Sequence, residues 1–167
     1  MQLFGLSEWS EQTMGPNDFQ AMTWHAKPSV RVRNDAAITL STGVSTALTF
    51  NTEVFDRWGM HSTASNTSRI TSVVSGMYFV GGCARFAANA TGSRSILVRK
   101  NGSSNIAFHR EQALATGVAV VTISTFIDLD VGDYIELEAT QDSGGNLDVD
   151  STADYSPVFW AAWHSRQ

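Results

Sequence analysis

The sequence is poor in cysteine, in long apolar runs and in positive charge, which are the features needed for disulfides, membrane-spanning helices and nucleic-acid binding. Cys83 is the only cysteine among 167 residues, so an internal disulfide cannot form. No stretch approaches the roughly 20 consecutive apolar residues that a membrane-spanning helix needs. Charged residues make up 16% of the chain and its formal net charge is −5, so a surface that neutralises phosphates is not expected. We therefore expect neither a membrane nor a nucleic acid as a partner.

The N-terminal region lacks the features of a secretory signal. Its first 26 residues contain no Lys or Arg, and Glu8 and Glu11 interrupt the apolar runs. We expect a protein that is synthesised in the cytoplasm without a signal peptide and reaches its destination by assembly.

Residues with catalytic or metal-binding chemistry are scattered along the chain. No two of the histidines have the i, i+4 spacing of a helical ligand pair, and one cysteine cannot complete a zinc site. The sequence contains no nucleophile elbow, phosphate-binding loop or dinucleotide fingerprint. We expect no enzymatic activity, no cofactor and no transition-metal site.

Acidic residues are concentrated towards the C-terminus, where nine of the 16 lie between Asp128 and Asp154. Within this run, Asp142, Asp148 and Asp150 surround a Ser-Gly-Gly-Asn segment, which resembles a flexible loop that supplies oxygen ligands to calcium. The spacing does not match an EF-hand. We favour the interpretation that this is a solvated acidic loop, with calcium binding as the alternative.

Residues 1–27 differ in pattern from the rest of the chain. They show no strand alternation, yet they contain four large aromatic residues: Phe4, Trp9, Phe19 and Trp24. Asn17 is a suitable N-cap for a short helix from Asp18 to about His25. Aromatic side chains that cannot form their own core pack on another surface, and interfaces are enriched in them. We favour docking on a partner; the alternative is that the segment folds back onto its own domain.

From Pro28 onward, strand signals recur at short intervals, with turn residues between them. The expected strands are 29–33, 37–40, 47–50, 69–74, 77–86, 95–99, 106–110, 118–129, 134–139 and 158–163. About ten short strands without a long helix favour an all-β sandwich or jelly roll.

Several short motifs in this region are more informative in their order than singly. They are Ala47–Phe50, Phe55–His61, Gly76–Val80, Ile96–Gly102, Ile127–Leu137 and Phe159. In this order and spacing they resemble the C1q-like branch of the C1q and tumour necrosis factor jelly-roll superfamily, over residues 28–164. The positions that carry the resemblance most clearly are Gly76, Tyr78, Asn101, Gly102, Gly132, Asp133 and Phe159.

The resemblance implies a ten-stranded antiparallel jelly roll that forms a compact homotrimer, with apolar and aromatic side chains near the three-fold axis. It also implies binding rather than catalysis. The sequence departs from secreted animal members of the superfamily because it lacks a collagen-like stalk and a signal peptide. Trimeric jelly rolls with a docking arm instead are similar to virion proteins of tailed bacteriophages, such as capsid decoration proteins and fibre knobs.

These observations lead to a specific expectation about function. Residues 1–27 form an arm that docks on the major capsid or tail protein of a phage, and residues 28–167 form a trimerisation domain displayed on the virion surface. The alternative is a receptor- or glycan-binding knob of a tail fibre. In that case an exposed aromatic ring of Trp58, Tyr155 or Trp160 would stack on a host sugar.

Overall fold

The computed structural model describes residues 27–152 and 155–166, and in these ranges strands are the only regular elements. The strands follow from the alternation in the sequence. In β1 (Ser29–Arg33), for example, Val30 and Val32 are buried and the residues between them are partly exposed. No helix in the described ranges is long and apolar enough to span a membrane.

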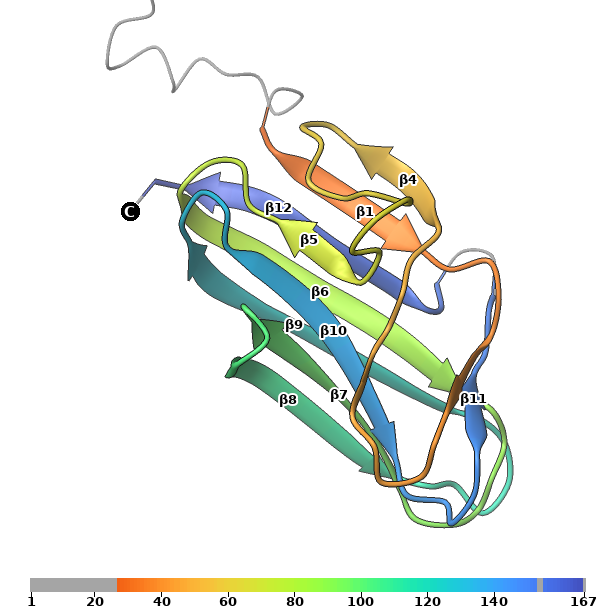
Figure 1. The fold of residues 1–167 in the computed structure, drawn as a ribbon. Coiled ribbons are helices and arrows are strands. Elements are labelled where there is room, and N and C mark those ends of the chain that lie inside the picture. Colours follow the sequence, from red (N-terminus) through yellow and green to blue (C-terminus); the bar gives the residue numbers. More distant parts are fainter. Residues whose placement is uncertain (1–26, 153–154, 167) are drawn as a thin grey trace, which may run out of the picture.

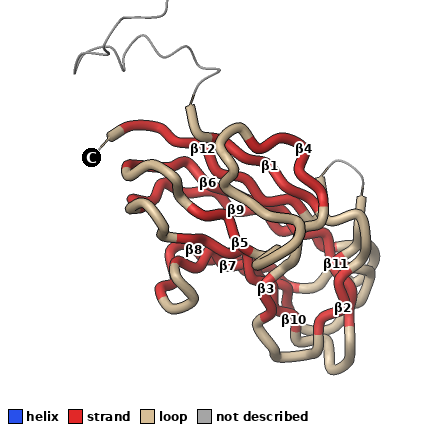
Figure 2. Tube along the Cα trace, turned by 45° about the horizontal axis from the view of Figure 1, so that its top comes forward, coloured by secondary structure: helices blue, strands red, loops and turns tan. Residues whose placement is uncertain are grey.

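Two antiparallel sheets make up the fold (Figures 1 and 2). Sheet A has the strand order β2-β11-β6-β12-β1-β4, with β9 also paired to β6. Its other strands are β2 (Ile38–Leu40), β4 (Thr52–Asp56), β6 (Gly76–Phe86), β9 (Ala119–Leu129), β11 (Leu147–Val149) and β12 (Val158–Ser165). Sheet B has the order β3-β10-β7-β8, with β5 also paired to β10. Its strands are β3 (Thr46–Ala47), β5 (Arg69–Thr71), β7 (Ser93–Lys100), β8 (Ser104–Gln112) and β10 (Tyr134–Gln141).

The hydrophobic core lies between the two sheets. Sheet A contributes buried side chains such as Val80 and Phe159, and sheet B contributes Val98 and Leu137. Because neighbouring strands are mostly distant in sequence, the core is built from long-range contacts. The arrangement is the expected all-β jelly-roll sandwich.

β6 is the centre of sheet A. It pairs along its whole length with β9, from Gly76 opposite Leu129 to Phe86 opposite Ala119, and with β12 on its other side. Because β6 lies between β9 and β12, the outward side chains of these three strands lie side by side on one face of sheet A.

The structure differs from the sequence-based expectation in the number of strands. The described residues contain twelve, because β4 and β11 lie in segments where no strand was expected. The segment 47–50 is strand only at Ala47; Leu48 and Phe50 are buried after β3 has ended. The helix expected from Asp18 to His25 lies outside the described residues.

Candidate interaction surface

Three aromatic side chains gather on the outer face of sheet A, and we call them the aromatic patch: Phe79 on β6, Phe126 on β9 and Trp160 on β12. Phe79 and Phe126 are partners in the β6–β9 register, and their ring centroids lie 4.9 Å apart. The ring of Trp160 meets Phe79 edge-on with a centroid distance of 4.7 Å. His164 extends the patch, with its ring 5.3 Å from that of Phe126. Such geometry is typical of favourable aromatic pairs.

The patch faces outward because its members alternate with core residues along their strands. Tyr78 and Val80 flank Phe79 and are fully buried. Phe79 and Phe126 remain 38% and 52% exposed. A contiguous exposed aromatic cluster of this kind indicates an interaction surface.

Gly81 gives Trp160 its place in the patch. The two residues are partners in the β6–β12 register. A Cβ atom at Gly81 would come within 2.5 Å of the indole Cζ2 of Trp160 and within 2.7 Å of the carbonyl oxygen of Ile123. Because both distances are too short for real contacts, the indole position depends on a glycine beneath it.

Two open grooves lie on either side of Trp160, which lines both. The first has a volume of about 350 Å³ and is lined by Arg31 and Phe55, among others. The second has a volume of about 340 Å³, and its lining includes Cys83 and Thr122. Cys83 is half-buried on the outer face of β6, where burial raises the pKa of its thiol. The grooves make the surface around Trp160 uneven, so that a matching surface can interlock with it.

The outer face of sheet B carries paired charges instead, and we call this set the charge ladder. Glu138 binds Arg99 through two contacts, Nε to Oε1 at 2.7 Å and an Nη2 donor to Oε2 at 2.9 Å. Glu136 accepts a hydrogen bond from the Ser68 hydroxyl at 2.7 Å and pairs with Arg69 at 3.4 Å. These charges compensate one another, so this face is suited to water.

The start of the described chain is fixed beside the end of β12 (Figure 1). The Lys27 ammonium donates to the His164 carbonyl at 3.3 Å and lies 5.1 Å from the ring centroid of Trp163. The backbone N–H of Trp163 donates to the Pro28 carbonyl at 2.9 Å, and its indole N–H donates to the Ser75 carbonyl at 3.3 Å. The described chain therefore begins at the pole where β12 ends.

The aromatic residues singled out in the sequence lie in different places. The four residues expected to dock, Phe4, Trp9, Phe19 and Trp24, lie outside the described residues. Trp58 and Tyr155 are 42% and 48% exposed and are separate from the aromatic patch. Of the three aromatics considered for sugar stacking, only Trp160 belongs to the patch. Its neighbours Phe79 and Phe126 were not identified from the sequence, because only the strand register brings them together.

Two of the turns that carry the resemblance meet at one end of the sandwich. The Asn101 side-chain amide donates to Asp133 Oδ1 at 2.7 Å. Asp133 Oδ2 accepts the backbone N–H of Asp130 at 2.9 Å and lies 2.6 Å from the Lys100 ammonium. The contacts from Lys100, Asn101 and Asp130 lower the pKa of Asp133 to about 2. The turn glycines have φ values of 67° at Gly102 and 90° at Gly132.

The other motif residues have structural roles in the core and at a turn. A Cβ atom at Gly76 would lie 2.4 Å from the Ser165 carbonyl oxygen, and Gly76 has a φ of 147°. Tyr78 is fully buried, and burial raises the pKa of its phenol. Phe159 stacks on Phe50 in the core, with ring centroids 5.9 Å apart.

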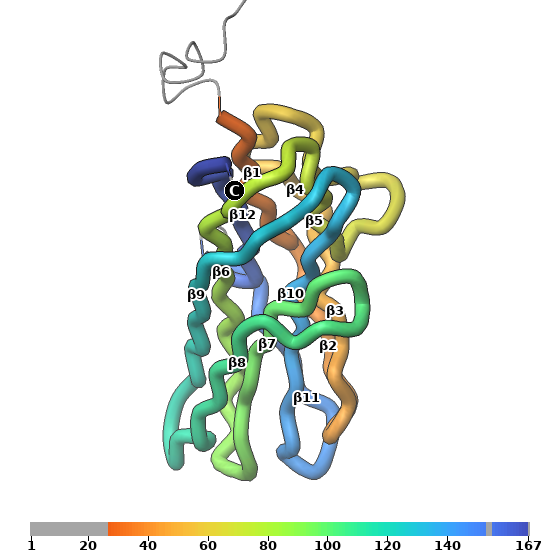
Figure 3. The backbone as a smooth tube through the Cα atoms, turned by 90° about the vertical axis from the view of Figure 1, so that its left-hand side faces the viewer, coloured from red at the N-terminus to blue at the C-terminus, as the bar shows by residue number. Residues whose placement is uncertain are grey.

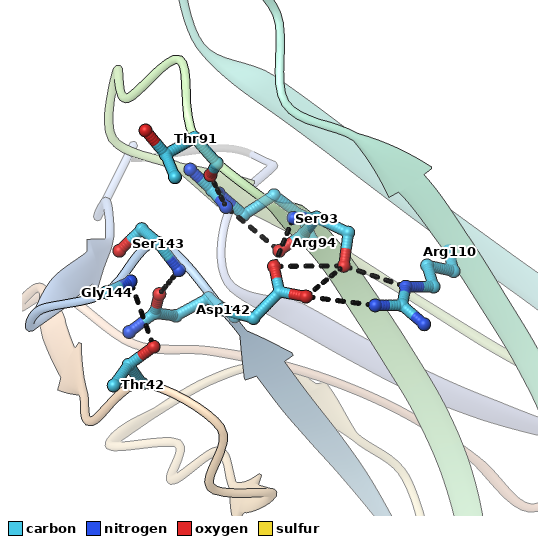
Figure 4. A network of polar contacts seen from close by, with 9 residues as sticks. Thr42, Thr91, Ser93, Arg94, Arg110, Asp142, Ser143 and Gly144 are labelled. Carbon is cyan, nitrogen blue, oxygen red and sulfur yellow. Dashed lines mark hydrogen bonds and ion pairs between the residues drawn. The ribbon is translucent and has the colours of Figure 1, made fainter.

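Asp142 belongs to a network that ties together the loops at the pole opposite Lys27 (Figure 4). Its carboxylate accepts hydrogen bonds from the backbone N–H and the hydroxyl of Ser93, and from Arg110 Nη2 at 3.0 Å. These contacts, that of the Ser93 N–H above all, lower the pKa of Asp142. In the same network the fully buried Arg94 donates to the Thr91 carbonyl at 3.0 Å.

The structure does not bring Asp142, Asp148 and Asp150 together around one point. Asp148 lies within β11, where it accepts from the Thr39 hydroxyl at 2.6 Å, and Asp150 pairs with Arg85. In the described ranges no group of three or more His, Cys, Asp or Glu side chains is arranged to hold a metal ion. The segment interpreted from the sequence as a solvated acidic loop is interrupted by β11, which contains Asp148.

Fold and surface together define an all-β jelly-roll sandwich with one aromatic outer face. No family model and no curated protein sequence matches the chain. The globular domain of zebrafish complement 1qA protein is 18% identical, with a TM-score of 0.60 over 84% of this chain and 100% of that domain. Eiger TNF from S. frugiperda is 9% identical, with a TM-score of 0.62 over 85% and 95% of the two chains. Murine APRIL is 11% identical, with a TM-score of 0.64 over 83% and 99%. At these identities the likeness establishes the C1q and TNF jelly-roll fold.

Proposed function

We propose that this chain is a non-enzymatic subunit of a homotrimer that assembles through the aromatic patch. The observation that carries the proposal is the cluster of the exposed Phe79 and Phe126 with the partly exposed Trp160 on an otherwise well-formed sandwich. Fully burying one large aromatic side chain contributes about 1.5–3 kcal/mol, and covering the exposed part of these partly buried rings contributes about half of that for each. Three such side chains in each subunit therefore offset part of the ordering cost of association.

A trimer also needs a second surface, because subunits related by a three-fold axis contact one another through two different patches. The edge formed by β8 and β9 offers one. Phe108 on β8 is 64% exposed and Val120 on β9 is 40% exposed. We propose that this edge of one subunit packs into the grooves beside Trp160 on the next subunit. The charge ladder then remains on the outside of the trimer.

The finer proposal concerns attachment to a phage particle. Residues 1–27 form the docking arm and residues 28–167 the trimeric body, which is displayed on the virion surface. Two observations support it: the arm is rich in aromatic residues, and its root at Lys27 is held at one pole by Trp163 and His164. The arm's partner is a capsid or tail protein, and the body stabilises or decorates the particle.

The trimer is tested by native mass spectrometry and light scattering of the full chain at micromolar concentration. A mass of three subunits supports it, and a monomer refutes it. Attachment is tested by deleting residues 1–26, which leaves Lys27 in place over Trp163. We expect the shortened chain to remain folded and trimeric but to lose binding to particles that lack the protein.

A full-length control distinguishes the effect of losing the arm's aromatic side chains from the effect of shortening the chain. In this variant Phe4, Trp9, Phe19 and Trp24 are all replaced by Ser. It should fail to bind particles to the same degree as the deletion. Normal binding by both variants would show that attachment lies on the jelly roll.

A further inference from the structure

A polar pocket lies in the connection between β4 and β5. Figure 3 shows this yellow loop on the side of the molecule opposite β9, so the pocket is remote from the β9 part of the aromatic patch. Its volume is about 220 Å³, and its lining is Gly59, Met60, His61, Ser62, Ser65, Asn66, Arg69 and Thr71. The pocket is therefore large enough for a small polar molecule.

The walls of the pocket are held rigidly by groups behind it. The Asp56 carboxylate accepts the backbone N–H groups of Trp58 at 3.2 Å and His61 at 2.9 Å. The imidazole of His61 is fully buried, with Nδ1 3.2 Å from a Glu53 carboxylate oxygen and Nε2 3.2 Å from the Thr67 carbonyl oxygen. Because both ring nitrogens are occupied, His61 shapes the pocket rather than binding a ligand.

Other polar groups of the lining are uncommitted. The side chains of Ser65, Asn66 and Thr71 take part in no hydrogen bond within the described ranges. Between them they offer two hydroxyls and one amide, which donate and accept equally well. The guanidinium of Arg69 stacks 3.9 Å from the Tyr134 ring centroid, and its charge is compensated by Glu136.

An aromatic surface lies next to this polar lining in the sequence. Trp58 precedes Gly59 of the pocket and is 42% exposed. An exposed indole offers a flat apolar face, whereas the neighbouring amide and hydroxyls offer directional polar contacts. A ligand with both an apolar face and a ring of hydroxyl groups would use the polar lining and the indole of Trp58 together.

From these features we infer that the pocket binds one neutral monosaccharide residue of a surface glycan. A pyranose has hydroxyls that both donate and accept, and its C–H face stacks on indole. The carboxylates of Glu53, Asp56 and Glu136 around the pocket disfavour acidic sugars. This sugar site is additional to the proposed trimer and does not depend on it.

The inference is tested by titrating the ¹⁵N-labelled full chain with methyl glycosides of glucose, galactose, mannose and their N-acetylated forms. We expect one of them to bind with a Kd on the order of 1 mM and to shift the signals of Asn66, Thr71 and the Trp58 indole. Methyl glucuronide should bind at least 10-fold more weakly. The inference would be overturned if no neutral glycoside caused shifts at concentrations up to about 50 mM, which is about 50-fold above the expected Kd. It would also be overturned if the shifts were confined to other residues.

Two conservative variants connect binding to the pocket. Thr71→Val removes the hydroxyl but keeps the branched shape, and Asn66→Gly removes the amide at a residue whose φ is already 49°. Each should weaken sugar binding at least 10-fold, whereas the control Thr140→Val on β10 should not. Unchanged binding by both variants would refute the site. Native mass spectrometry of the same samples reports the oligomeric state separately, so failure of the trimer is distinguishable from failure of the sugar site.

Discussion

The outer faces of the two sheets are built from the same strand alternation but carry opposite chemistry. On sheet A the outward positions of β6, β9 and β12 hold stacked aromatic rings. On sheet B the outward positions of β10 and β7 hold Glu138 and Arg99, which neutralise each other. A sandwich needs only its inner faces to fold, so the outer faces are free to differ. The difference is the basis of the proposal that one face meets protein and the other meets water.

The strongest test of this comparison replaces the two paired rings of the aromatic patch. Phe79→Ser combined with Phe126→Ser should weaken trimer association by about 1.5–3 kcal/mol per subunit, because the exposed half of two aromatic side chains is no longer covered on assembly. Dilution series followed by light scattering measure the change. Val131→Ser, at a turn residue that is 66% exposed, is the matched control and should remain trimeric. A double variant as trimeric as the wild type would show that the patch is not the interface.

A second test displaces Trp160 without altering it. Gly81→Ala places a Cβ atom where the indole and a backbone oxygen lie, so we expect a loss of about 2–3 kcal/mol in the free energy of unfolding. Gly145→Ala is the control, because its Cβ would meet nothing within 4 Å. That variant should stay within about 0.5 kcal/mol of the wild type. Equal denaturation midpoints for the two variants would contradict the packing described for Trp160.

The third prediction concerns the junction between the two sheets. Asp133 lies in the turn between β9 of sheet A and β10 of sheet B, and Asp133→Ala should lower the free energy of unfolding by about 2 kcal/mol. Because folding lowers the pKa of Asp133 from 3.8 to about 2, its contribution is complete above about pH 5 and is lost progressively as the pH falls through about 2. Denaturation of the wild type and the variant across this pH range measures it. A difference that stays constant with pH would contradict the assignment.

The smallest effect is expected on the charge ladder. Glu138→Gln leaves the side-chain shape but removes the charge that pairs with Arg99, and the loss should be about 0.5–1 kcal/mol, decreasing with added salt. The oligomeric state should not change. A variant that dissociates would place the ladder within an interface and remove the contrast between the faces.

Sequence patterns were sufficient to predict the sandwich and most of its strands. Alternation identified Val30 and Val32 in β1, and the turn at Gly132-Asp133 was located correctly. β4 was missed because it pairs only with β1 and leaves Val54 and Phe55 exposed, so it lacks a buried face. β11 was missed because its few residues lie in an acid-rich segment.

The candidate surface was less predictable than the fold, for a physical reason. Phe79, Phe126 and Trp160 are far apart in the sequence, and only the registers of β6 with β9 and β12 place them together. Local patterns do not specify such registers in advance. The pocket between β4 and β5 likewise depends on how Asp56 and Glu53 hold the loop, which involves contacts that alternation does not encode.

The pair Gly81-Gly82 has a further consequence for motion in the sheet. Gly81 is bare on the outer face under Trp160, and Gly82 is bare on the inner face, where a Cβ would lie 2.6 Å from Leu137 Cδ2. At this point the central strand, which is paired with β9 and β12, has no side chain of its own on either face, so rings and methyl groups of neighbouring strands cover its backbone. Slow amide hydrogen exchange at these two glycines therefore measures the integrity of both layers at once. Faster exchange at Gly81 and Gly82 would therefore report loosening of either the Trp160 indole on the outer face or Leu137 on the inner face.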